Sequence, residues 1–177
     1  MEFISTNRDV DDSELDVRLA KKGNKEAFGR LIEKHKSSMY RIALSLMSNK
    51  QDIEDALQST IVKAYEGIIY LRRDEYFKTW LIRILINECK AILKNCKKVV
   101  PVEAVNCGLG TMEDYTRFEL TSAVNSLEKD LRVVTTLFYF EDLSQKDIAK
   151  LLDIPEGTVS SRLSRARSKL YEMLKEK

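Results

Sequence analysis

The sequence predicts an all-α protein. Only six glycines and two prolines occur among 177 residues, so the turns that punctuate a β-sheet are scarce. Apolar residues instead recur at three- and four-residue steps in blocks rich in Leu, Lys, Glu, Ala and Ile, which favour helix. A hydrophobic content of 44% is enough for a core and too high for a disordered chain.

The N-terminal half predicts a four-helix unit over residues 12–95. A short helix is expected to start at the cap residue Ser13 and to end at Gly23 after a basic last turn. A second helix is expected from Glu26, because the apolar residues that follow form one buried stripe as far as Met47.

The third and fourth helices of this unit flank a loop. The third has an acidic first turn, which suits the positive end of a helix, and it leaves Asp52, Asp55 and Gln58 outward. Residues 67–76 mix apolar and basic side chains and predict the loop. The fourth helix is expected over residues 77–94.

A second, smaller helical domain is expected over residues 119–177. Residues 96–118, which precede it, contain a proline, two close glycines and no sustained helical period, and they predict a flexible linker. Between Leu143 and Leu170 the pattern is helix, tight turn, helix. Ser144 is the expected cap, and the small Ala149 permits the close crossing that such a turn demands.

The last helix predicts a DNA-reading face. Its apolar side is turned inward, and short serines with arginines cover the opposite side. A solvated basic face is the alternative, but the turn, the small alanine and the arginine spacing agree with one another and favour DNA. Arg165 is the expected bidentate contact to guanine, while Arg162 and Arg167 are expected to meet phosphates. The residues expected to contact DNA are Thr158, Ser160, Ser161, Arg162, Ser164, Arg165 and Arg167.

Charge is distributed unevenly along the chain. Residues 67–100 carry eight Lys or Arg against three Asp or Glu, and residues 144–177 carry eight against five. The stretch between them, 101–143, carries three against eight. Two basic blocks separated by an acidic one indicate local nucleic-acid surfaces, although the net charge is only +2.

These motifs together resemble the extracytoplasmic-function (ECF) sigma factors, the smallest bacterial sigma subunits of RNA polymerase. Region 4 of that family, the helix-turn-helix that recognises the minus-35 promoter element, is similar to DIAKLLDIPEGTVSSRLSRARSKL. Regions 2.1, 2.2 and 2.3–2.4 are similar to KEAFGRLIEKHKSSMYRIAL, DIEDALQSTIVKAY and FKTWLIRILINECK. The resemblance covers nearly the whole chain in the family's order and implies a sigma region 2 unit and a sigma region 4 unit.

The resemblance also implies partners. Asp52, Asp55 and Gln58 match the polar face that grips the clamp helices of the largest polymerase subunit, and the flap region is a further expected contact. Contact with the melted minus-10 strand is implied for Arg72, Arg73, Tyr76, Lys78, Thr79, Trp80, Arg83 and Asn87. An aromatic residue with basic residues beside a loop suits an unstacked base. Trp80 is equally consistent with core packing, and Asn87 with a satisfied interior amide.

The chain departs from the family pattern at a few positions. Ser59 stands where the family usually has Glu, which bears on the polymerase contact. Leu127 and Glu128 replace the common Leu-Pro before the last domain. Ser160 stands where many members have a basic residue, so the minus-35 preference is left open.

Enzyme chemistry finds little support in the sequence. His35 is the single histidine, so a histidine-based metal cluster or catalytic triad cannot be assembled, and no glycine-rich phosphate loop occurs. Cys89, Cys96 and Cys107 form no CxxC pair. We therefore expect no catalytic residue, no metal, no cofactor and no small-molecule substrate.

The expected partners are core RNA polymerase, promoter DNA and an anti-sigma factor, which in this family is often anchored in the membrane. The acidic N-terminus and the lack of a long apolar run predict a cytoplasmic chain. Two rival functions stay open: a helix-turn-helix regulator that works without polymerase, and an enzyme or metal-dependent sensor using the thiols and His35. Reversing the charges on the predicted polymerase face discriminates the first, and metal analysis discriminates the second.

Overall fold

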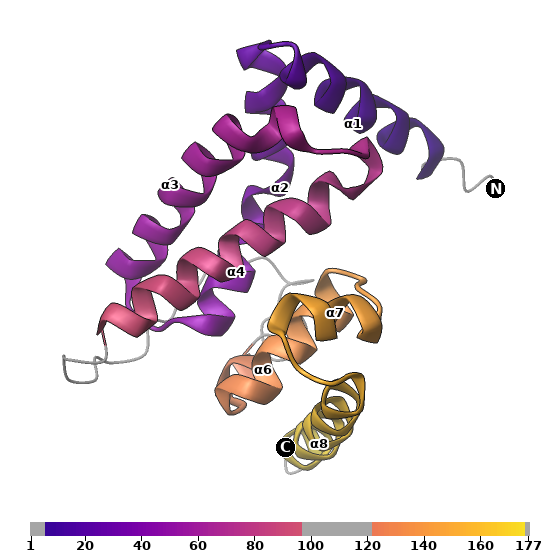
Figure 1. Ribbon diagram of the computed structural model, residues 1–177. Helices are drawn as coiled ribbons and strands as arrows, with labels where there is room; N and C mark the ends of the chain where they lie inside the picture. Colours follow the sequence, from indigo (N-terminus) through magenta and orange to yellow (C-terminus); the bar gives the residue numbers. More distant parts are fainter. Residues whose placement is uncertain (1–5, 97–121, 176–177) are drawn as a thin grey trace, which may run out of the picture.

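The computed structural model describes residues 6–96 and 122–175, and every regular element within them is helical (Figure 1). The N-terminal unit consists of α1 (Thr6–Lys21), α2 (Lys25–Leu46), α3 (Lys50–Gly67), the short 3₁₀ turns η1 (Ile68–Tyr70) and η2 (Asp74–Tyr76), and α4 (Phe77–Cys96). The C-terminal unit has helical residues 122–126, α6 (Lys129–Thr135), a π-helical segment η3 (Thr136–Phe140), α7 (Gln145–Leu152) and α8 (Glu156–Lys175). The predicted linker lies largely outside the described residues.

The four helices expected in the N-terminal unit are confirmed, with one correction at the first. Helix α1 begins at Thr6, so the prediction that it starts at Ser13 is wrong. Ser13 is a residue type that often caps a helix, but here the chain is already helical before it. Asn24 and Asn49 cap α2 and α3, each side chain accepting a bond from the backbone N–H three residues on, at 2.9 and 3.1 Å.

The segment predicted as a loop contains the two 3₁₀ turns. They lead the chain from the end of α3 to the start of α4, which pack against each other. A Cβ on Gly67 would lie 3.2 Å from Cζ2 of Trp80, so a glycine at this position leaves room for the indole. The indole of Trp80 therefore packs closely against the C-terminal end of α3.

The helix-turn-helix of the C-terminal unit is confirmed. Ser144 caps α7, its hydroxyl accepting a bond from the N–H of Asp147 at 3.1 Å. Asp153 ends the helix in the left-handed conformation at φ 60°, and the N–H of Ile154 donates to the carbonyl of Ala149 at 3.1 Å. Helix α8 then lays Val159 and Leu163 into the core, both almost fully buried.

The two units pack directly on each other. Helix α2 contacts α6 and η3, and α4 contacts α7. One cluster of buried apolar residues runs through both units, and Val134 and Leu137 in it are fully covered. A second, small cluster within the C-terminal unit contains Leu127, Leu131 and Ala166. Among the described helices, none has the length and apolar character needed to cross a bilayer.

Candidate nucleic-acid and polymerase interface

Helix α8 presents the face that the sequence predicted. Leu163 and Ala166 are 1% exposed and anchor it, while Ser160, Ser164 and Arg165 are exposed on the opposite side. Ser161 and Arg167 are also exposed, and Thr158 is half-buried. Helix α7 packs against α8, which holds this outer face in a fixed orientation.

The arginines of α8 differ in their surroundings. Arg162 is half-buried, and its guanidinium lies 2.5 Å from a carboxylate oxygen of Asp130 on α6. The Arg162 guanidinium is therefore paired with another residue of the protein, and this pairing was not predicted from the sequence. Arg165 contributes, after Lys169, to the field that keeps the pKa of Glu128 below its usual value. Lys169 itself forms a 2.6 Å ion pair with Glu128.

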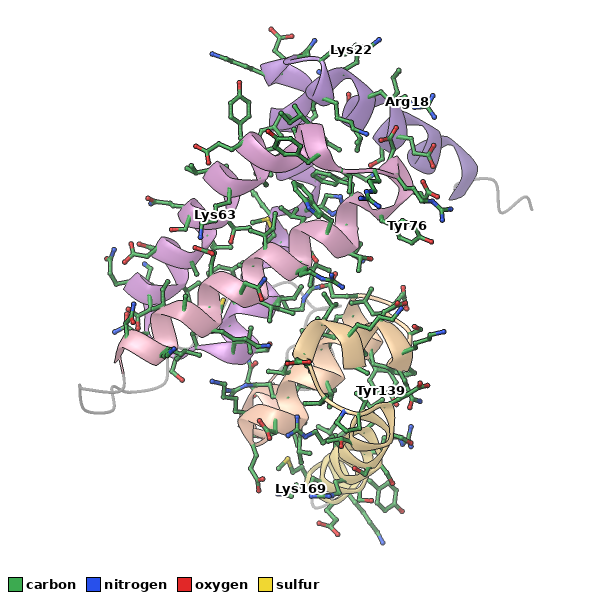
Figure 2. All side chains as sticks on the ribbon, in the orientation of Figure 1. Arg18, Lys22, Lys63, Tyr76, Tyr139 and Lys169 are labelled. Carbon is green, nitrogen blue, oxygen red and sulfur yellow. The ribbon has the colours of Figure 1, made fainter. Side chains whose placement is uncertain are left out.

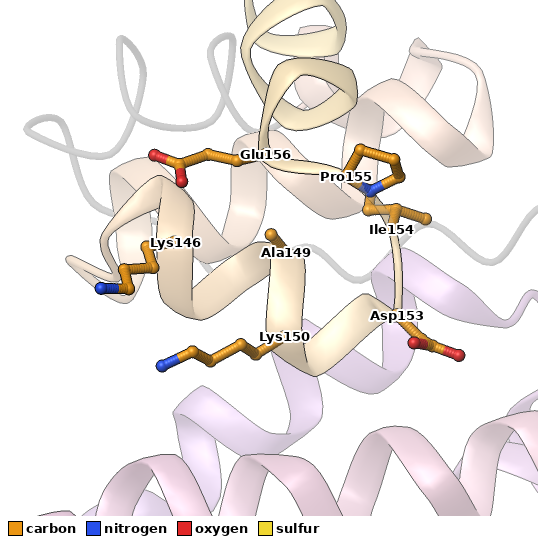
Figure 3. Close-up of a pocket in the computed structure, with 7 residues that line it drawn as sticks. All are labelled: Lys146, Ala149, Lys150, Asp153, Ile154, Pro155 and Glu156. Carbon is orange, nitrogen blue, oxygen red and sulfur yellow. The ribbon is translucent and has the colours of Figure 1, made fainter.

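A shallow, open pocket lies between α7 and the start of α8 (Figure 3). Two lysines one turn apart on α7 extend their ammonium groups beside it. The first helix of a helix-turn-helix crosses the DNA backbone, so these lysines are suited to phosphate contacts that we did not anticipate from the sequence. Their signal was the four-residue spacing on the exposed side of α7. The lining residues are Lys146, Ala149, Lys150, Asp153, Ile154, Pro155 and Glu156.

Five residues predicted to contact the minus-10 strand share one stripe. At 100° per residue, Tyr76, Thr79, Trp80, Arg83 and Asn87 fall within about a third of the circumference of α4 and its lead-in turn. Tyr76 is 49% exposed, and Arg83 and Asn87 are exposed as well. Figure 2 shows Tyr76 reaching away from the N-terminal unit.

The loop arginines and Trp80 extend this surface. Arg72 and Arg73 are exposed, and the guanidinium of Arg73 lies 4.8 Å from the ring centre of Tyr76. Trp80 is half-buried, with its ring 5.9 Å from that of Phe77. It packs against the core, so the structure gives the indole a supporting position beneath the loop.

Lys78 stands apart from the other minus-10 candidates. It lies about 140° around the helix axis from Arg83, on the side of α4 that faces the C-terminal unit. Its ammonium lies 3.2 Å from a carboxylate oxygen of Glu141, at the end of η3. The structure therefore separates Lys78 from the stripe.

The predicted polymerase face lies on successive turns of α3. Asp55 and Gln58 are exposed and Asp52 is half-buried, and Gln51 donates to Asp55 at 3.1 Å. The same stripe continues at three- and four-residue steps into exposed apolar side chains, Val62 at 56% and others further along. Exposed apolar residues in a row indicate a protein partner. This apolar half, which we did not predict, comprises Val62, Tyr65 and Ile69.

Comparison with known proteins identifies the family of this chain. The family model for sigma-70 region 2 matches residues 31–97, and the model for sigma-70 region 4 matches residues 117–170. The ECF RNA polymerase sigma-E factor of Haemophilus influenzae is 32% identical over 169 residues, covering 85% of this chain and 89% of the relative. The chain belongs to the ECF sigma factors. It is therefore a transcription initiation factor.

Further relatives and a solved structure support the same family. The ECF RNA polymerase sigma factor SigW of Bacillus subtilis is 26% identical, covering 90% of this chain and 95% of the relative. The solved structure of the sigma factor RpoE in complex with the anti-sigma factor NepR, from Bartonella quintana, has a TM-score of 0.71 at 28% identity. It covers 84% of this chain and 96% of that one. The regions matched in the sigma factor thus span both structural units.

Proposed function

We propose that this sigma factor binds core RNA polymerase and directs it to specific promoters for transcription initiation. Residues 12–95 hold the polymerase and melt the minus-10 DNA, and residues 119–177 read the minus-35 element. The observation that carries the proposal is the outer face of α8, whose serines and Arg165 are exposed while Leu163 anchors the opposite side. Catalysis belongs to the polymerase, so the chain needs no active site of its own.

The polymerase contact is the stripe on α3. Its polar half, with Asp55 and Gln58, is suited to the clamp helices of the largest subunit, and its apolar half supplies buried area. Val62 and Tyr65 remain 56% and 41% exposed in the isolated chain, so a partner can cover them. The flap region is the expected contact of the C-terminal unit.

An anti-sigma factor is the proposed regulator. The Bartonella quintana RpoE structure is a complex with an anti-sigma factor, which supports the same kind of partner for this chain. We place the sigma factor in the cytoplasm, where such a partner, when anchored in the membrane, would hold it at the inner face.

Run-off transcription tests the proposal. Purified chain added to core polymerase on a promoter library is expected to start RNA at a small set of promoters. A variant carrying Asp55→Lys and Gln58→Lys should lose polymerase association while still binding DNA. Glu33→Lys, an exposed charge reversal on α2, is the matched control and should behave as the wild type. Full initiation by the doubly substituted variant, or none by the wild type, would contradict the proposal. DNA binding by the wild type without any polymerase contact would favour an independent regulator.

A further inference from the structure

A buried carboxylate joins the two units of the chain. Glu141, at the end of η3, is 3% exposed, and its side chain enters a cluster on α2 and α4. Arg41 donates to one carboxylate oxygen at 2.7 Å, and Lys78 lies 3.2 Å from the other. The hydroxyl of Ser38 also donates to this carboxylate. Two cations and a hydroxyl from the N-terminal unit thus converge on a single anion from the C-terminal unit.

Neighbouring contacts reinforce this junction. Lys78 also donates to the backbone carbonyl of Glu141 at 3.0 Å, and the guanidinium of Arg41 lies 5.3 Å from the ring centre of Phe140. Arg132 of α6 donates to the carbonyl of Ser45 on α2 at 3.0 Å. These hydrogen bonds and ion pairs between the two units exist only while the units are in contact.

The Glu141 carboxylate and the groups of Ser38, Arg41 and Lys78 compensate one another's charge and hydrogen-bonding needs. A buried carboxylate is costly unless cations and hydrogen bonds compensate it. When the units separate, Glu141 gains water, and Arg41, Lys78 and Ser38 are left as an empty anion site on the N-terminal unit. Guanidinium, ammonium and hydroxyl groups bind phosphate oxygens as readily as carboxylate oxygens.

The site flanks the first turn of the α4 stripe that is proposed to hold melted DNA, because Lys78 lies about 100° around the helix axis from Thr79. Lys78 occupies the first turn of α4, one residue before Thr79 and two residues after the end of the predicted loop, residues 67–76, which carries Arg72 and Arg73. A strand whose bases follow the stripe on α4 brings its phosphates near that turn. Promoter DNA and Glu141 would then compete for the same groups.

We propose that Ser38, Arg41 and Lys78 form a phosphodiester-binding site, which Glu141 occupies in the closed chain and from which single-stranded DNA displaces it. The inference rests on the proposed function, because it takes DNA as the ligand. It assigns a DNA contact to Ser38 and Arg41, and it makes the acidic end of η3 an internal competitor of DNA.

The binding of a random-sequence single-stranded 20-mer by the full chain tests the site, because phosphate contacts need no particular promoter. Glu141→Gln is expected to tighten binding about tenfold, since the neutral amide competes poorly for two cations. Asp142→Asn is the matched control. It removes the same charge from the next residue, which is exposed and has φ 54°, a conformation that Asn accepts. It should leave the affinity unchanged.

The salt dependence identifies the groups involved. In the Glu141→Gln background, Arg41→Ala should lower the slope of log K against log salt by about 0.7, the value for one phosphate contact on a single strand. Lys78→Met should do the same, and it provides a second reading if the Arg41 variant does not fold. Equal affinity of Glu141→Gln and wild type, or an unchanged slope in the folded variants, would overturn the proposal. Run-off transcription by the wild type reports separately on the proposed function.

Discussion

Replacing Arg165 tests the central claim about α8. Its guanidinium is exposed on the serine-lined face, and α8 is held in place by Leu163 on the opposite side. A bidentate arginine–guanine pair is worth about 1–3 kcal/mol of discrimination, so Arg165→Ala should weaken specific promoter binding by roughly 5- to 150-fold. Binding to unrelated duplex should fall far less. Competition electrophoresis at fixed salt, with a selected minus-35 duplex and a scrambled one, measures both effects.

Arg162→Ala is the matched control within the same helix. Arg162 is paired with Asp130, whose side chain is 63% exposed, and such a surface ion pair contributes at most about 1 kcal/mol to stability. This variant should lose little sequence discrimination. Circular dichroism must show that both proteins fold. Equal losses on the two duplexes for folded Arg165→Ala would refute the base-reading role of Arg165.

Three further predictions concern stability and reactivity. Leu163→Ala should lower the free energy of unfolding by about 2–5 kcal/mol, because the side chain is 1% exposed, whereas Leu163→Met should cost less than about 1.5 kcal/mol; urea titration measures both. Burial raises the pKa of Cys89 to about 12. In a variant with Cys96 and Cys107 changed to Ser, the remaining Cys89 thiol should therefore resist alkylation at pH 8 until the chain unfolds. Rapid labelling of the folded variant would contradict this prediction. Burial, with Lys78 and Lys34, lowers the pKa of His35 from 6.5 to about 4, so the folded protein binds fewer protons than the unfolded chain between these values. Stability should therefore fall by up to roughly 3 kcal/mol as the pH drops through this window, and His35→Leu should remove that slope in urea titrations.

Local chemistry was sufficient for most of the secondary structure. Ser144 was recognisable as a cap, and the turn before α8 followed from Asp153, Ile154 and Pro155. The first helix was misjudged because Ser13 is also a good cap, although α1 continues seven residues before it. The π-helical segment η3 has no comparable sequence signal, because π-helix is rare and has no residue preference strong enough to predict it.

Sequence periodicity also placed side chains on the correct faces of isolated helices. It put Asp55 and Gln58 outward on α3 and Leu163 inward on α8, and the structure confirms each position. It could not show that Arg162 meets Asp130, since that contact depends on how α6 and α8 cross. The DNA and polymerase roles of these residues remain predictions.

By itself, the sequence determined the helices, their amphipathic faces and the sigma-factor family, because these depend on short-range spacing and on motifs read in order. Only the tertiary structure decided that the two units close on each other and that Glu141 is buried between Arg41 and Lys78. The sequence showed an acidic stretch between two basic blocks. It did not show which residues pair, because Arg41 lies 100 positions and Lys78 lies 63 positions from Glu141 along the chain. Their pairing depends on how the two units pack, which no local pattern encodes.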